Sequence, residues 1–68
     1  MSVYYVNKRA QDNGDHEVHT STCAFLPSSE NRQYLGEFSH CRSAVQEAKK
    51  YYLKSNGCAR CSPDCHTK

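Results

Sequence analysis

Two short pairs of potential metal ligands, His19-x3-Cys23 and Cys58-x2-Cys61, constrain this chain more than any other feature of its sequence. Structural Zn²⁺ is usually held by four tetrahedral nitrogen or sulfur ligands, and these often come from two closely spaced pairs. Two residues between Cys58 and Cys61 let the backbone turn so that both sulfurs lie about 2.3 Å from one metal ion. The pattern therefore predicts a single structural zinc ion bound by all four side chains, which would close the long loop between the two pairs.

A crosslink of this kind is what a chain of this size needs in order to fold. Its 68 residues make one small domain, which buries only about 60% of the surface that the unfolded chain exposes. Large apolar residues are scarce: there is no Trp, there are only two Phe, and the mean hydropathy of the chain is -0.90. Hydrophobic burial alone barely offsets a conformational entropy cost of ~1–2 kcal/mol per ordered backbone residue, so disulfides or a metal must contribute.

The five cysteines and four histidines could supply either kind of crosslink. The N-terminal segment MSVYYVNKRA lacks the apolar run and the cleavage site of a secretory signal, and no segment reaches the roughly 18–20 apolar residues of a membrane span. We therefore expect a cytoplasmic protein that does not contact a membrane. Thiols stay reduced in that compartment, which favours a metal over disulfides, and an odd cysteine count would also leave one thiol unpaired.

The first half of the chain predicts strands. Residues 3–6 form a β-branched and aromatic run, and residues 17–19 are expected to return antiparallel to it. Asn13-Gly14, between these segments, suits the positive φ angles of a tight hairpin turn. Residues 33–38 are expected to form a third, short strand.

One amphipathic helix is expected after these strands, from an N-cap at Ser39 to Lys54 or Ser55. Asn56-Gly57 is expected to end it, because glycine adopts the left-handed conformation freely. The apolar stripe of the helix consists of Cys41, Ala44, Val45, Ala48, Tyr51 and Tyr52. Cys41 is thus expected in the core as a free thiol. The whole pattern predicts an α+β fold, in which a small antiparallel sheet of two or three strands and this helix surround the zinc site.

The last seven residues, 62–68, are expected to form a C-terminal tail outside a zinc-binding module of residues 1–61. Cys65 or His66 in this tail could replace His19 as the fourth ligand, because the spacing Cys61-x3-Cys65 would also bring a sulfur near the metal. The alternative is an exposed and frayed tail that carries a free thiol.

These features together resemble the Ada-type metal-binding domain, the small zinc module at the N-terminus of the bacterial Ada DNA-repair protein. The likeness covers residues 4–61 and is carried by Tyr5-Val6-Asn7-Lys8, His19-x3-Cys23, Pro27, Glu30-Asn31-Arg32, Ala44, Ala48 and Gly57-Cys58-x2-Cys61. The resemblance implies a compact α+β fold around one tetrahedral zinc. In Ada all four ligands are cysteines, and the first accepts a methyl group from a DNA phosphotriester. Here His19 stands at that position, and imidazole cannot act as the same thiolate nucleophile, so methyl transfer is not expected.

The predicted function is that of a small zinc-binding or adaptor module, with a protein as its partner and without catalytic activity. Four protein ligands would leave no position on the metal for a reactive water molecule. The alternative is a nucleic-acid-binding module related to the Ada domain, in which basic side chains contact phosphates and Tyr4, Tyr34 and Tyr51 stack on bases. The net charge of +2 is too small to decide between these readings.

Overall fold

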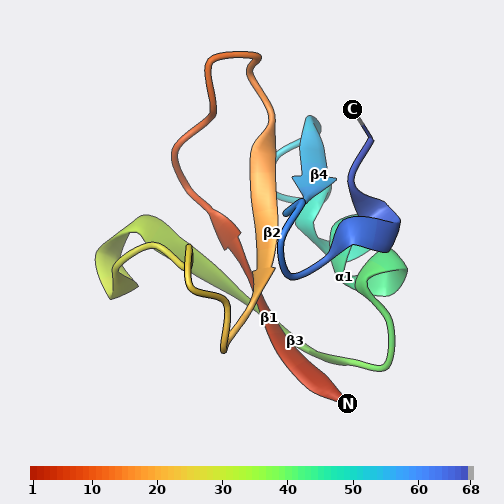
Figure 1. The fold of residues 1–68 in the computed structure, drawn as a ribbon. Coiled ribbons are helices and arrows are strands. Elements are labelled where there is room, and N and C mark those ends of the chain that lie inside the picture. Colours follow the sequence, from red (N-terminus) through yellow and green to blue (C-terminus); the bar gives the residue numbers. More distant parts are fainter. Residues whose placement is uncertain (68) are drawn as a thin grey trace.

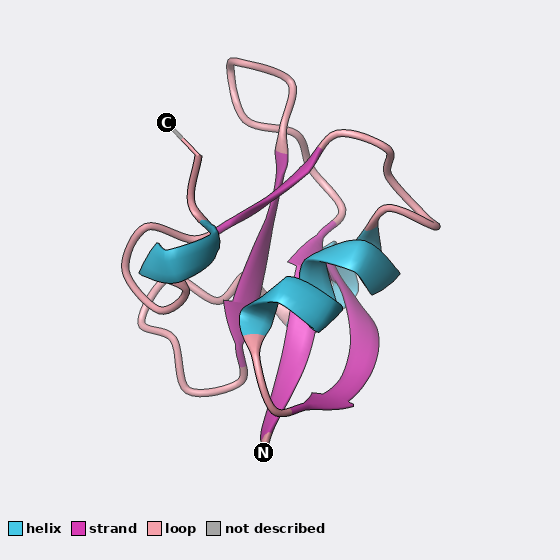
Figure 2. Cartoon of the chain, turned by 90° about the vertical axis from the view of Figure 1, so that its right-hand side faces the viewer, coloured by secondary structure: helices cyan, strands magenta, loops and turns pink. Residues whose placement is uncertain are grey.

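The computed structural model describes residues 1–67 and places one α-helix across one face of a four-stranded sheet (Figures 1 and 2). The elements are β1 (Ser2–Asn7), β2 (His16–Thr20), β3 (Arg32–Phe38), α1 (Cys41–Ala48) and β4 (Ser55–Gly57), with 3-10 turns at Ser29–Asn31 and Pro63–Cys65. The strand order is β3-β1-β2-β4; β4 runs parallel to β2, whereas the other pairs are antiparallel. The predicted α+β class and the single helix are confirmed, but the predicted antiparallel sheet of two or three strands is wrong.

The hairpin of β1 and β2 forms as the sequence predicts. Its register pairs Val6 with Val18, and both side chains are fully buried on the face that α1 covers. Gly14 has a φ of 90°, and its N–H donates to the carbonyl oxygen of Gln11 over 2.8 Å. The positive φ is the reason that the turn takes a glycine at this point.

The third predicted strand is also present, as β3, and it pairs with the other edge of β1. The register shifts there: Tyr4 pairs with Gly36 and Tyr5 pairs with Tyr34, so Leu35 is the extra residue of a β-bulge. Leu35 is buried in the core cluster.

The helix is shorter than predicted and is capped by a different residue. His40, not Ser39, is the N-cap, and its Nδ1 accepts a hydrogen bond from the N–H of Arg42 over 3.0 Å. The helix ends at Ala48 rather than at residue 54 or 55. Among the described residues, no helix has both the length and the apolar character needed to cross a membrane.

Contacts with β2 explain why the helix ends early. The Tyr52 ring stacks on the His16 ring with centroids 3.9 Å apart, and the N–H of His16 donates to the carbonyl oxygen of Lys54 over 2.7 Å. These contacts draw the chain away from the helix axis and into β4. Tyr51 consequently points away from the core and is 52% exposed, so its place on the predicted apolar stripe is wrong.

The core lies between α1 and the sheet, and its helix side is built from small residues. The buried cluster consists of Tyr4, Val6, Val18, Leu35, Cys41, Ala44 and Ala48. Phe38, Val45 and Tyr52 pack against its edges. Alanine side chains let the helix approach the strands closely, but they contribute little apolar area, so the cluster is a small source of stability for a whole domain.

Asn56-Gly57, predicted to end the helix, instead belongs to β4 and holds the C-terminal segment in place. The Asn56 Oδ1 accepts hydrogen bonds from the N–H groups of Gly57 and Thr67, over 2.9 and 3.0 Å. Cys65 forms a disulfide with Cys41, so the expected free thiol at Cys41 is wrong. The alternative of a frayed tail is also wrong as far as residue 67; Lys68 lies outside the described residues.

Gly57 offers a direct test of this docking. A Cβ atom added there would lie 2.7 Å from the Cys65 Cβ and 2.9 Å from the Ser62 carbonyl oxygen, closer than packed atoms tolerate. We expect Gly57→Ala to lower the free energy of unfolding by about 1–3 kcal/mol, as overpacking does. Urea denaturation of the oxidised protein measures this change. Asp12→Ala, at an exposed position, is the control and should shift stability by less than about 0.5 kcal/mol. Equal stability of the two variants would contradict the tight packing.

Candidate metal centre

The four predicted ligands come together because β4 pairs with β2. His19 lies on β2 and Cys23 lies in the loop that follows it, whereas Cys58 and Cys61 follow β4. The N–H of Cys58 donates to the carbonyl oxygen of Val18 over 2.9 Å, which continues the ladder and sets Cys58 beside His19. One ligand atom from each of the four side chains lies within 4.8 Å of the other three.

The spacing of the ligand atoms is close to that of a tetrahedral zinc site. Zn–S bonds of about 2.3 Å at tetrahedral angles separate two sulfurs by about 3.8 Å, and a sulfur from an imidazole nitrogen by about 3.6 Å. The Cys23 and Cys58 Sγ atoms are 3.8 Å apart. The Cys61 Sγ is 4.0 Å from the His19 Nδ1, so a contraction of a few tenths of an ångström would complete this edge. Three sulfurs and one imidazole are a donor set that zinc prefers.

Backbone N–H groups point at two of the sulfurs. Thr20 donates to the Cys61 Sγ over 3.3 Å, and Arg60 donates to the Cys58 Sγ over 3.4 Å. Hydrogen bonds of this kind stabilise the thiolate, which is the form of cysteine that binds a metal.

Two of the three thiols in this cluster, those of Cys23 and Cys61, have pKa values shifted in opposite directions. Burial raises the pKa of Cys23 to about 12, and the neighbouring Cys61 sulfur adds to the effect. Burial also acts to raise the pKa of Cys61, but hydrogen bonds from the Cys23 thiol and the Thr20 N–H outweigh it, so this pKa is lowered. Loss of the thiol proton is therefore easier at Cys61 than at Cys23.

His19 is oriented to act as a neutral ligand. Its side chain is 1% exposed, and burial lowers its pKa, with partial opposition from the Glu17 carboxylate. Its Nδ1 is the ring nitrogen near the Cys61 sulfur. Its buried Nε2 lies 3.5 Å from the Glu17 Oε1 and has no hydrogen-bond partner in the described part of the chain. A metal at Nδ1 would fix the proton on Nε2, where it would point toward Glu17, as carboxylates often orient metal-binding histidines.

The two alternative fourth ligands lie elsewhere. Cys65 is bonded to Cys41, and the His66 Nδ1 lies 3.0 Å from the carbonyl oxygen of Gly57, which makes it a hydrogen-bond donor to the backbone. His19 is therefore the residue that the fold brings to the three sulfurs. The binding of zinc itself stays a prediction.

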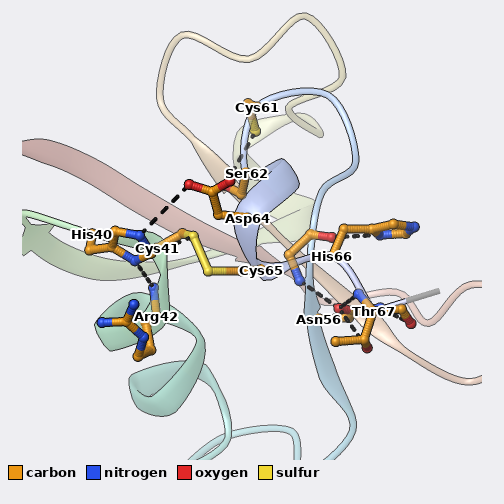
Figure 3. Close-up of a disulfide and its surroundings, with 11 residues drawn as sticks. His40, Cys41, Arg42, Asn56, Cys61, Ser62, Asp64, Cys65, His66 and Thr67 are labelled. Carbon is orange, nitrogen blue, oxygen red and sulfur yellow. Dashed lines mark hydrogen bonds and ion pairs between the residues drawn. A yellow bond between two sulfur atoms is a disulfide. The ribbon is translucent and has the colours of Figure 1, made fainter.

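A second group of potential ligands escaped the sequence analysis. The second group consists of the two disulfide cysteines, Cys41 and Cys65, and His40, whose ligand atoms lie within 4.8 Å of one another (Figure 3). The sequence hint was present in the adjacent pair His40-Cys41, but 24 positions separate Cys41 from Cys65, and only the docked tail joins them.

Comparison with known proteins found no matching family model, curated protein or solved structure. The case for a metal centre therefore depends on the geometry and chemistry of these side chains.

Replacing each of the two candidate histidines in turn shows which of them is the fourth ligand. We expect His19→Ala to weaken Zn²⁺ binding by more than about 100-fold, because losing a direct ligand should exceed the 10–100-fold effect of losing an outer-shell partner. His66→Ala is the matched control and should bind zinc as the unchanged protein does. Competition with a chromogenic chelator, at constant pH and in the oxidised protein, measures both affinities. Loss of affinity in His66→Ala alone would assign the fourth ligand to the tail.

Proposed function

We propose that this protein is a small structural-zinc module that serves as a binding or adaptor unit and has no catalytic activity. The observation that carries this proposal is the cluster of His19, Cys23, Cys58 and Cys61, whose donor atoms approach tetrahedral spacing. Four protein ligands would complete the coordination of zinc and exclude a reactive water molecule. The metal would then act through the fold that it stabilises.

The position of the cluster supports a structural role. A metal there would crosslink β2, the loop after it and the segment after β4, three parts of the chain that meet at one side of the sheet (Figure 1). The apolar core is small, so a crosslink between distant segments would add substantially to stability.

Exposed apolar side chains support a protein partner. Phe25 is 56% exposed and lies two residues after Cys23, in a loop that the metal would hold. Tyr51 and Leu53 follow the helix and are 52% and 82% exposed. Large apolar side chains of this kind contribute strongly to protein–protein interfaces when a partner covers them.

Removing the metal tests the structural role. We expect a strong chelator at neutral pH to remove one zinc ion per chain and to lower the free energy of unfolding by several kcal/mol, because metal binding and folding are coupled in such modules. Circular dichroism and urea denaturation follow the change, and added Zn²⁺ should reverse it. A protein that is isolated without metal and keeps the same stability in chelator and in Zn²⁺ would refute the proposal.

A nucleic-acid-binding module is the second candidate, and two arginine–aromatic pairs favour it. The Arg60 guanidinium lies 5.1 Å from the ring centroid of the exposed Phe25, next to the metal cluster. On the sheet, Arg32 lies 4.7 Å from the Tyr5 ring centroid, and Tyr34 meets Tyr5 edge-on. Arginines can contact phosphates while neighbouring rings stack on bases. The resemblance to the Ada zinc module points in the same direction.

Salt dependence distinguishes this candidate from a protein-binding role. If the module binds nucleic acid, its affinity for a short oligonucleotide should fall between about 50 and 200 mM salt, because phosphate contacts release counterions. Fluorescence anisotropy with single-stranded and duplex DNA and RNA measures this. The Arg60→Ala variant should bind more weakly, whereas Arg9→Ala, a control at an exposed arginine outside both arginine–aromatic pairs, should bind nearly as well. No binding at the lower salt concentration would exclude this candidate.

A further inference from the structure

The two disulfide cysteines and the neighbouring His40 form a second set of potential metal ligands, which has no residue in common with the first cluster. Cys41 opens α1, Cys65 ends the last 3-10 turn, and His40 caps the helix. The His40 Nδ1 lies 3.7 Å from the Cys41 Sγ, and its Nε2 lies 3.9 Å from the Asp64 Oδ2 (Figure 3). Two sulfurs and an imidazole therefore lie together at the edge of the core, with a carboxylate beside the imidazole.

We propose that reduction of the Cys41–Cys65 disulfide creates a second metal site, in which Cys41, Cys65 and His40 bind one Zn²⁺-type cation. Two thiolates and one imidazole are a zinc donor set that leaves the fourth position to a solvent molecule. This proposal does not depend on the role proposed for the first cluster, because the two sites have no residue in common and Cys23, Cys58 and Cys61 are free thiols.

The distances suit such a site. A sulfur and an imidazole nitrogen bound to one zinc ion are about 3.6 Å apart, close to the separation of the Cys41 Sγ and the His40 Nδ1. The surroundings of His40 resemble those of His19. In each case a carboxylate, from Asp64 or Glu17, lies near Nε2, while Nδ1 lies near a sulfur. We assign Asp64 as a positioning residue that orients the ring.

The two cysteines should remain close after reduction, because the tail is held by other contacts. Gly57 packs directly against Cys65, leaving no room there for a side chain. The Asn56 Oδ1 binds the N–H of Thr67 over 3.0 Å, and His66 donates to the Gly57 carbonyl oxygen. The Cα atoms of the two cysteines are 6.2 Å apart, so side-chain rotation can separate the sulfurs to the ~3.8 Å of a zinc-bound pair.

Solvent can reach the site through a cavity beside it. This cavity of about 150 Å³ is lined in part by His40, Cys41 and Asp64, and also by Cys61 of the first cluster. It gives a cation and a coordinated water molecule room to enter. The Asp64 side chain is 82% exposed. Coordination through Nδ1 would replace the hydrogen bond that His40 accepts from Arg42, so metal binding would exchange a helix cap for a metal bond.

The redox step balances with an external dithiol as the reductant. A thiolate of the dithiol attacks the Cys65 Sγ, because Cys65 is more exposed than the buried Cys41, and the bond between the two protein sulfurs breaks. Cys41 leaves as a thiolate, and the second thiol of the dithiol then displaces Cys65. The dithiol becomes a disulfide and supplies two electrons. The two protein thiolates either take up two protons or bind the cation without them.

Metal stoichiometry in the two redox states tests the proposal. The full chain is prepared oxidised, or reduced with a phosphine, which becomes a phosphine oxide, and is then titrated with Co²⁺. Native mass spectrometry counts the bound ions, and thiolate-to-Co²⁺ charge-transfer absorption reports sulfur ligation. We expect the reduced protein to bind one more ion per chain than the oxidised protein. In Cys23→Ser, which impairs only the first cluster, reduction should still add one ion.

Variants identify the ligands of the added ion. Cys65→Ser should bind the same number of ions with and without the phosphine. In the reduced protein, His40→Ala should weaken binding of the added ion by at least about tenfold and leave binding of the other ion unchanged. His66→Ala, the matched control, should still bind both ions. An equal number of ions in the two redox states would overturn the site. Unchanged affinity in His40→Ala would overturn the assignment of its third ligand.

Discussion

The parallel pairing of β4 with β2 is the contact on which both cysteine groups depend. It extends past the strand through the hydrogen bond from Cys58 to Val18, which delivers the second ligand pair to His19. Gly57, the last residue of β4, has no side chain, so the segment that contains Cys65 can pack directly against it. Three residues of strand thus position four potential zinc ligands and one disulfide, although the strand contributes little apolar surface of its own.

Both cysteine groups include residues of the same C-terminal segment. Cys58 and Cys61 belong to the candidate metal centre beside β2, and the Cys41–Cys65 disulfide anchors the last part of the chain to α1. Because the apolar core is small, the disulfide is an important source of stability. The disulfide also departs from the expectation that all the thiols stay reduced, which followed from the predicted cytoplasmic location.

The elements that the sequence predicted well are those with a local signal. β1 and β3 contain β-branched or aromatic residues, and Gly14 adopts the positive φ that its turn requires. The helix end and β4 had no such signal. The three residues of β4, Ser-Asn-Gly, have low strand propensity, and the strand forms because β2 offers an unpaired edge. The prediction that Tyr51 belongs to the apolar stripe is wrong for the same reason. The pairing of β4 with β2 ends the helix at Ala48, although the apolar periodicity of the sequence continues past that residue.

The sequence alone determined the α+β class, the first three strands, the presence of one helix and the two closely spaced ligand pairs, with Cys65 and His66 as alternatives to His19. Their spacing is a property of the chain, because residues three or four apart must lie near one another in space. Only the tertiary structure decided that His19 rather than His66 faces the sulfurs, and that Cys41 pairs with Cys65. Those choices depend on which distant segments pack together, and that is set by the β2–β4 pairing and the space left beside Gly57.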